Sequence, residues 1–237
     1  TQFRRIMDGG ITGQEPQPTE LEQVDAWVDV STQRWQTLAD TLPAGTTCKL
    51  EHGHYSIAYQ FFANGLEPLR GNNLLDALRV RPRVTTGWPP FVVFHRDGIT
   101  PYVFEDNIES WLGQEPDERA TRHSDFWQAS PSGQFFLLRG YQEDDQEISD
   151  YQPGEAFDLT LPTWRVAEVL YHAMAMAEQF GGEGGRLTIV VEWTGLAGRW
   201  LRAWANSNRT ISDRYQARQD VYRSHVSLGL DALEDSM

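Results

Sequence analysis

The longest regular pattern of apolar residues lies in the second half of the chain. Between residues 163 and 180, apolar side chains recur at helical spacing, at Val166, Leu170, Ala173, Ala177 and Phe180. This spacing predicts a helix with one buried face, and Pro162 suits its first position, where a missing N–H costs nothing. The glycines of 181–185 end the helix, and the apolar, β-branched run 187–193 predicts a strand covered on both faces. We therefore expect a central helix packed on a sheet.

A second helical pattern lies near the start of the chain. Apolar residues share one helical face from 19 to 42, at Leu21, Val24, Val28, Trp35, Leu38 and Leu42. The Pro43–Gly45 segment stops this N-terminal helix. Alternating apolar residues in 54–62 predict a half-buried strand, and 135–138 and 221–230 read as further strands.

Three shorter elements are predicted from local signals. Asp97-Gly98 lies between two apolar runs, which predicts a tight hairpin that pairs 91–95 with 100–104. Asp106 or Asn107 could cap a short helix that continues to residue 112. The apolar residues between 200 and 204 predict one more short helix.

Together these elements predict an α+β fold. A mainly antiparallel sheet would pack against the long central helix and the N-terminal helix. Gly9, Gly10, Gly13, Pro16 and Pro18 break any period in residues 1–18, so this segment is expected to be a linker or N-terminal arm. Residues 19–237 would form the α+β domain, with the charged stretch 113–122 as the place where it could divide into two lobes.

Composition and net charge indicate which partners the chain can bind and in which cellular compartment it works. The chain has 237 residues and a net charge of −14, which repels nucleic-acid phosphates and anionic lipid surfaces. We expect no direct nucleic-acid binding by this chain alone and no membrane partner, since no apolar run approaches the ~20 residues that span a bilayer. The single Cys48 fits a reducing cytoplasm. Nine tryptophans exceed what a core requires, which favours a pocket or an interface.

The ends of the central helix and its strand carry the main candidate site. Trp164, Arg165 and Glu168 lie just after the helix start. Trp193 ends the strand, and Arg199 and Trp200 follow it. If helix and strand run antiparallel, both groups reach the same edge. Indole rings could then stack an aromatic ligand while the two guanidiniums hold a carboxylate or phosphate. Alternatively, Arg165 pairs with Glu168 or a loop carboxylate, and the tryptophans fill the core.

A secondary candidate group is Arg139, Glu143 and Asp144, directly after the predicted strand 135–138. Paired carboxylates could serve as acid and base or hold Mg²⁺, whereas blocks of charge commonly form a solvated acidic loop. His52 and His54 alternate as two metal ligands on a strand would, but no third ligand follows at a recognisable spacing. We therefore assign no metal and no cofactor.

Six segments of the chain resemble a known bacterial family. They are TGWPP at 86–90, IESWL at 108–112, DFW at 125–127, SGQFFLLRGYQED at 132–144, LPTWRVAEVLYHA at 161–173 and WTGLAGR at 193–199. From about Thr86 onward the chain resembles the region that follows the Alba-like, Schlafen-type domain of bacterial ATP-binding proteins and transcriptional regulators. The resemblance implies a companion module with that upstream domain, or a partner protein, as its partner. It transfers no functional residues to this chain.

Two classes of function follow. The first is a non-enzymatic regulatory module of a larger bacterial regulator, which binds a small molecule or a partner through its tryptophan-rich surface. The second is a hydrolytic or nucleotide-processing enzyme that uses Arg139, Glu143 and Asp144. The sequence shows no recognisable nucleophile, metal set or phosphate loop, which favours the first class.

Overall fold

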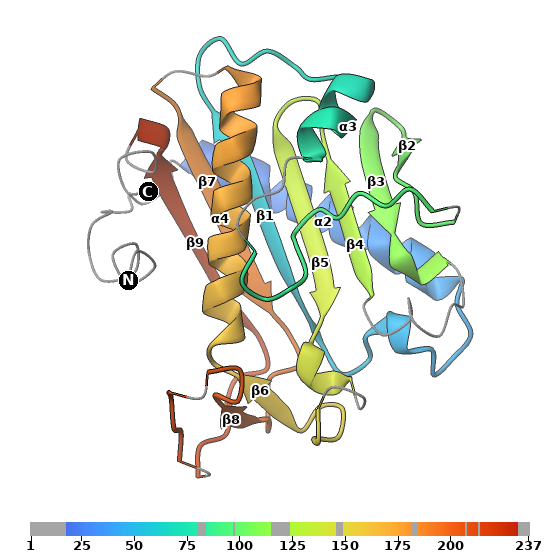
Figure 1. Ribbon diagram of the computed structural model, residues 1–237, viewed down its shortest axis with the longest axis vertical. Helices are drawn as coiled ribbons and strands as arrows, with labels where there is room; N and C mark the ends of the chain where they lie inside the picture. The colour runs from blue at the N-terminus through green and yellow to red at the C-terminus, as the bar shows by residue number, and fades with distance from the viewer. Residues whose placement is uncertain are drawn as a thin grey trace.

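A single antiparallel sheet of seven strands organises the molecule (Figure 1). The computed structural model describes residues 18–79, 84–96, 98–114, 124–145, 149–181, 184–206, 208–212 and 214–231. The strands are β1 (His54–Phe62), β2 (Tyr102–Phe104), β3 (Asn107–Trp111), β4 (Asp125–Ala129), β5 (Gln134–Gly140), β7 (Arg186–Trp193) and β9 (Tyr222–Gly229). Their order across the sheet is β2-β3-β4-β5-β1-β7-β9. The central strand β1 therefore pairs with β5 on one side and β7 on the other.

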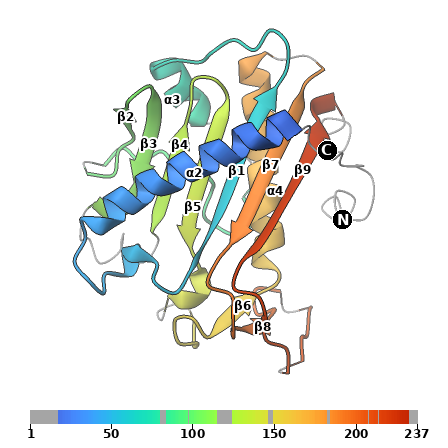
Figure 2. The same ribbon diagram turned by 180° about the vertical axis from the view of Figure 1, so that it is seen from behind.

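One long helix covers each face of the sheet. Helix α4 (Leu161–Phe180) crosses the face seen in Figure 1, beside the shorter α3 (Asn72–Leu78). Helix α2 (Pro18–Asp40) crosses the opposite face (Figure 2). This three-layer arrangement confirms the predicted α+β fold, with a mainly antiparallel sheet between the central and the N-terminal helix.

Alternation along the strands explains the two layers of core. In β1, Tyr55, Ile57, Tyr59 and Phe61 belong to the core beneath α4, whereas Ala58 belongs to the core beneath α2. Side chains of successive strand residues point to opposite faces, so one strand supplies both cores. The α2 layer adds buried residues at helical spacing, Val24, Trp27, Val28, Trp35 and Ala39.

A second, smaller sheet lies at one end of the molecule, at the bottom of Figure 1. It pairs β6 (Ala156–Asp158) with β8 (Trp200–Arg202) in parallel. The Asp158 carboxylate accepts the backbone N–H groups of Thr160 (2.6 Å) and Leu161 (3.0 Å), so it caps the start of α4. Three short 3₁₀ helices complete the described elements: η1 (Thr47–Lys49), η2 (Leu112–Gln114) and η3 (Gln142–Asp144).

Three local predictions are wrong. Residues 91–95 are not a strand, because Phe91 turns into the core at φ 50° and stacks on His172 with ring centroids 4.5 Å apart. Strand β2 instead pairs with β3, so 107–111 is a strand and not a helix. Residues 200–202 form β8, since they pair with the distant β6.

Two predictions about chain organisation stay untested. The expected arm at 1–18 lies outside the described residues except for Pro18, and so does most of the 113–122 stretch. Within the described part of the chain, no helix combines the length and apolar character that a membrane crossing requires.

Candidate binding site

The start of α4 and the end of β7 lie at the same end of the molecule, next to β6 and β8 (Figure 1). Strand pairing places Tyr55 of β1 opposite Trp193 of β7. The Arg165 guanidinium from α4 lies over the Tyr55 ring, 4.8 Å from its centroid, and donates to the Tyr55 hydroxyl. The two segments therefore meet at the edge where the sequence placed the candidate site.

Two tyrosines link the two candidate arginines. The rings of Tyr55 and Tyr141 stack with centroids 6.4 Å apart. The Arg199 guanidinium lies 4.7 Å from the centroid of Tyr141. Arg165 and Arg199 thus belong to one continuous cluster of aromatic rings and guanidiniums, and they are not on opposite sides of the molecule.

Arg199 is a structural cross-link and not a ligand-binding group. Its side chain is fully buried. Both Nη atoms donate to the Asp144 carboxylate at 2.7 Å, and they also donate to the carbonyls of Ala156 (2.8 Å) and His52 (2.6 Å). The Nε atom donates to the Gly195 carbonyl at 2.7 Å. Every donor of this guanidinium is therefore used inside the protein, which corrects the prediction that Arg199 holds a ligand anion.

Glu168 and Arg165 do not pair with each other through a hydrogen bond. The buried Glu168 carboxylate accepts the backbone N–H groups of Thr85 and Thr86 and the Thr86 hydroxyl (2.8 Å), so it anchors the loop before Trp88. Among the described residues, Arg165 donates a hydrogen bond only to Tyr55. The alternative in which Arg165 pairs with Glu168 is thus wrong. Its other form, in which Arg165 acts on a loop carboxylate, has support, because the charge of Arg165 partly offsets the rise that burial causes in the pKa of Glu143.

The three tryptophans of the candidate set differ in burial. Trp193 is almost completely buried, and its ring lies 6.0 Å from that of Tyr222. Trp164 and Trp200 are half-buried. Arg202 lies over the Trp200 ring, 5.6 Å from its centroid. Of the three, Trp193 is the one that reaches the pocket described below.

The secondary candidate group is built into the fold. Arg139 forms a buried ion pair with Asp125 (Nη2 to Oδ2, 2.7 Å) and donates to the Pro89 carbonyl. The Glu143 carboxylate accepts the backbone N–H of Asp158 at 2.7 Å, and burial raises its pKa. Asp144 is the bidentate partner of Arg199.

The expectation of a solvated acidic loop is therefore wrong for Glu143, which is buried within η3. Its carboxylate fixes the backbone that leads into α4, and this contact accounts for its burial. In the described ranges, no three His, Cys, Asp or Glu side chains come together as metal ligands would.

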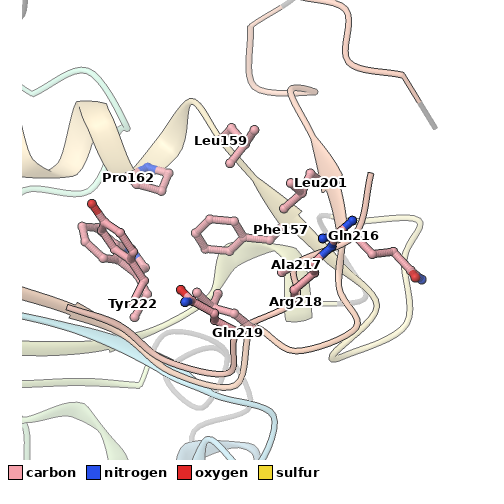
Figure 3. Close-up of a pocket in the computed structure, with 11 residues that line it drawn as sticks. Phe157, Leu159, Pro162, Leu201, Gln216, Ala217, Arg218, Gln219 and Tyr222 are labelled. Carbon is pink, nitrogen blue, oxygen red and sulfur yellow. The ribbon is translucent and has the colours of Figure 1, made fainter. Parts of the chain in front are cut away.

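An apolar pocket of about 570 Å³ opens beside Trp193 (Figure 3). It lies between the start of α4, the small sheet and the segment that leads into β9. Its lining residues are Phe157, Leu159, Pro162, Trp193, Leu196, Leu201, Gln216, Ala217, Arg218, Gln219 and Tyr222. Figure 3 shows the Phe157 ring in the middle of this lining, directed towards Tyr222. Three aromatic side chains, Phe157, Trp193 and Tyr222, therefore wall one cavity.

Exposed apolar side chains gather around the same end. The described residues include seven exposed large hydrophobic side chains, and five of them belong to this end: Leu159, Trp204, Tyr215, Val221 and Tyr222. Backbone hydrogen bonds hold their segments together. The N–H of Leu159 donates to the Arg202 carbonyl (2.8 Å), and the N–H of Leu201 donates to the Tyr215 carbonyl (2.9 Å). Two of the five, Leu159 and Tyr222, also line the pocket, and exposed apolar side chains at a cavity are typical of a binding site.

Most of the pocket was missed at the level of sequence. Only Trp193 belongs both to the predicted site and to the pocket lining. The sequence prediction placed a strand at 221–230 and gave residues 215–220 no role, although the exposed Tyr215 and Tyr222 lie in a part of the chain rich in arginine. That combination of exposed aromatic and basic residues is the signal that could have identified it.

Comparisons of the chain with family models, with curated proteins and with solved structures give no match. The likeness to the region after an Alba-like domain rests on the six sequence segments alone. Support for a function therefore comes from the geometry of the pocket and of the buried polar groups around it.

Proposed function

We propose that this chain is a non-enzymatic regulatory module that binds a ligand or a partner, and that the pocket walled by Phe157, Trp193 and Tyr222 is its contact site. The pocket carries the proposal, because its volume of about 570 Å³ and its largely apolar lining match those of small-molecule sites. Leu159 and Tyr222 of this lining are also exposed, so apolar surface is accessible at the pocket.

The sequence resemblance supplies the proposed setting. The module would belong to a larger cytoplasmic bacterial regulator, in which an upstream Alba-like domain or a partner protein provides the nucleic-acid or nucleotide chemistry. Ligand binding at the pocket would then change how the module contacts that domain.

The alternative of a hydrolytic enzyme is less well supported. A general acid or base must reach a substrate proton, yet the Glu143 carboxylate holds the Asp158 backbone and Asp144 holds Arg199. Arg139 is similarly paired with Asp125. The enzyme hypothesis requires Arg139, Glu143 and Asp144, and all three form structural contacts within the protein.

A neutral apolar dye tests the pocket directly. N-phenyl-1-naphthylamine should bind the wild-type chain and gain fluorescence, whereas Ala217→Trp should weaken binding at least about tenfold, because an indole would fill the cavity that Ala217 lines. Leu159→Trp, at an exposed lining position, should weaken binding without disturbing the core. Val103→Trp on the distant strand β2 is the matched control and should bind like wild type.

Circular dichroism of each variant establishes that the fold is retained. Equal dye binding by Ala217→Trp, Leu159→Trp and Val103→Trp would show that the pocket is not the site. Turnover of a nucleotide or ester by the purified chain, lost in Glu143→Gln, would contradict the non-enzymatic assignment, since that variant keeps the acceptor for Asp158.

A further inference from the structure

Positive charge is concentrated in the segment that builds one wall of the pocket. Residues 199–223 contain six arginines and two aspartates, in a chain whose net charge is −14. The segment includes β8 and the pocket residues 216–219 and Tyr222. One wall of the pocket therefore comes from a segment of net positive charge, in a strongly acidic protein.

Two of these arginines form ion pairs away from the pocket. Arg199 pairs with Asp144, and Arg223 pairs with Glu192 of β7 (3.0 Å) and Asp25 of α2 (2.5 Å). Arg202 lies over the rings of Trp200 and Tyr151. Arg218 differs from these three, because it is exposed, lines the pocket and has no hydrogen bond or ion pair with any described residue.

The remaining polar groups of the pocket lie beside Arg218. Gln216 and Gln219 are its neighbours in the chain, and both are exposed lining residues. The opposite lining is apolar and includes Phe157, Leu159 and Pro162 (Figure 3). The cavity thus has an apolar body, and its exposed polar lining residues are Gln216, Arg218 and Gln219.

We propose that the pocket takes a small amphipathic anion. Its apolar body would lie among Phe157, Trp193 and Tyr222, and its carboxylate, sulfonate or phosphate would lie against the Arg218 guanidinium. This inference rests on the proposed function, since it requires the pocket to be a ligand site.

Electrostatics favour an anion over a neutral ligand of the same shape. A guanidinium binds a carboxylate or phosphate through two parallel hydrogen bonds, which a neutral apolar molecule cannot use. The acidic remainder of the chain repels anions at long range. A bound anion therefore needs a nearby positive charge, such as that of Arg218, to offset this repulsion. Binding of an anion would therefore order the exposed side chain of Arg218.

Two dyes of similar shape and different charge separate this inference from the proposed function. Anilinonaphthalene sulfonate carries a negative charge, whereas N-phenyl-1-naphthylamine is neutral. In the full chain, Arg218→Gln should raise the Kd for the sulfonate dye about five- to tenfold and change that for the neutral dye by less than about twofold. Arg209→Gln removes the same charge from an exposed residue of the segment that does not line the pocket, and it should change both constants by less than about twofold.

The outcomes are distinguishable. Binding of neither dye at a site that Ala217→Trp blocks would overturn both the proposed function and this inference. Binding of both dyes at that site, with equal effects of Arg218→Gln and Arg209→Gln on the sulfonate dye, would overturn only the role of Arg218. The inference holds if the Arg218→Gln effect is confined to the anionic dye and exceeds that of Arg209→Gln.

Discussion

Arg139 and Arg199 each present two guanidinium nitrogens to one buried or half-buried carboxylate. Their partners, Asp125 and Asp144, lie 14 and 55 residues away in the chain. Arg165 differs, because its described hydrogen bond goes to the neutral hydroxyl of Tyr55. At the scale of single residues, the buried guanidiniums therefore hold loops in place. Arg139, which pairs with Asp125 across β4 and β5, holds the Pro89 carbonyl, and Arg199 holds the carbonyls of His52 and Gly195.

Removing Arg199 should destabilise the fold strongly. Arg199→Met keeps much of the side-chain volume but removes the guanidinium from the carbonyls of His52, Ala156 and Gly195 and from the Asp144 carboxylate. The Asp144 carboxylate would keep the Gly154 backbone N–H as a donor but lose its charged partner. Breaking a buried ion pair from one side costs about 3–5 kcal/mol, and urea unfolding would measure that loss. The exposed Arg209→Met is the control and should leave the unfolding midpoint nearly unchanged. A loss below about 1 kcal/mol in Arg199→Met would contradict the cross-linking role.

His172 should make the stability of the protein depend on pH. Burial lowers the pKa of His172 to about 3, and in the unfolded chain it returns to its ordinary value near 6.5. Between these values the unfolded state binds the extra proton, so the free energy of unfolding falls as the pH falls. His172→Asn, which can still bond to the Tyr59 hydroxyl, should lose less stability than wild type between pH 6.5 and 4.5.

Urea unfolding at several pH values measures the difference in slope, expected to be up to about 1 kcal/mol per pH unit. His54, whose pKa burial lowers to about 4, titrates in the same window but is present in both proteins. Identical slopes for His172→Asn and wild type would contradict the assignment of a neutral, buried imidazole.

At the scale of elements, long amphipathic segments were predictable and short ones were not. Helices α2 and α4 and strands β1, β5, β7 and β9 lie close to their predicted positions. The helices and β1 repeat an apolar spacing, whereas β5 and β7 are continuous apolar runs. Strand β8 was mistaken for a helix, since three residues carry no period and its partner β6 lies far away in the sequence. The Asp97-Gly98 signal misled for a related reason: the apolar residue Phe91 packs inward from a loop.

Two loops that approach one another closely connect the strands to the site. A Cβ at Gly195 would clash with the carbonyl of His52, and one at Gly53 would clash with that of Thr194. Both glycines have positive φ, at 66° and 120°. The same crossing brings the His52 and Gly195 carbonyls to Arg199. Glycine is thus required at this crossing both for its backbone angles and for its lack of a side chain.

Alanine substitutions can separate these two requirements. Gly195→Ala and Gly198→Ala both place a side chain at positive φ, but a Cβ at Gly198 meets nothing within 4 Å. Gly198→Ala should therefore cost about 1 kcal/mol from the backbone alone, and Gly195→Ala at least twice as much. Thermal unfolding of the two variants gives the comparison. Equal losses would show that the loops move apart freely and that the crossing does not hold the site.

At the scale of the whole molecule, the pocket is assembled from segments that are distant in sequence. Its walls come from β6, the start of α4, the end of β7 and the segment before β9. The sequence predicted that the helix start and the strand end would meet, and they do. It could not predict the wall formed by Phe157 and 216–222, because the order in which β6, β8 and β9 come together depends on long-range pairing.

The molecule also separates its tryptophans by face. Trp27, Trp35 and Trp111 belong to the core beneath α2, whereas Trp193 lies in the pocket beneath the start of α4. Their indole N–H groups are therefore reporters of where a molecule binds. This distribution gives the most direct test of the central claim, that the pocket beside Trp193 is the binding site.

That test is a titration of the ¹⁵N-labelled chain with anilinonaphthalene sulfonate, followed through the indole N–H signals and with Trp193 assigned by Trp193→Phe. The account predicts that the Trp193 signal shifts progressively while those of Trp27, Trp35 and Trp111 stay in place, and that Ala217→Trp abolishes the shift. An unmoved Trp193 signal under conditions where the dye is bound, or shifts confined to the tryptophans beneath α2, would contradict it.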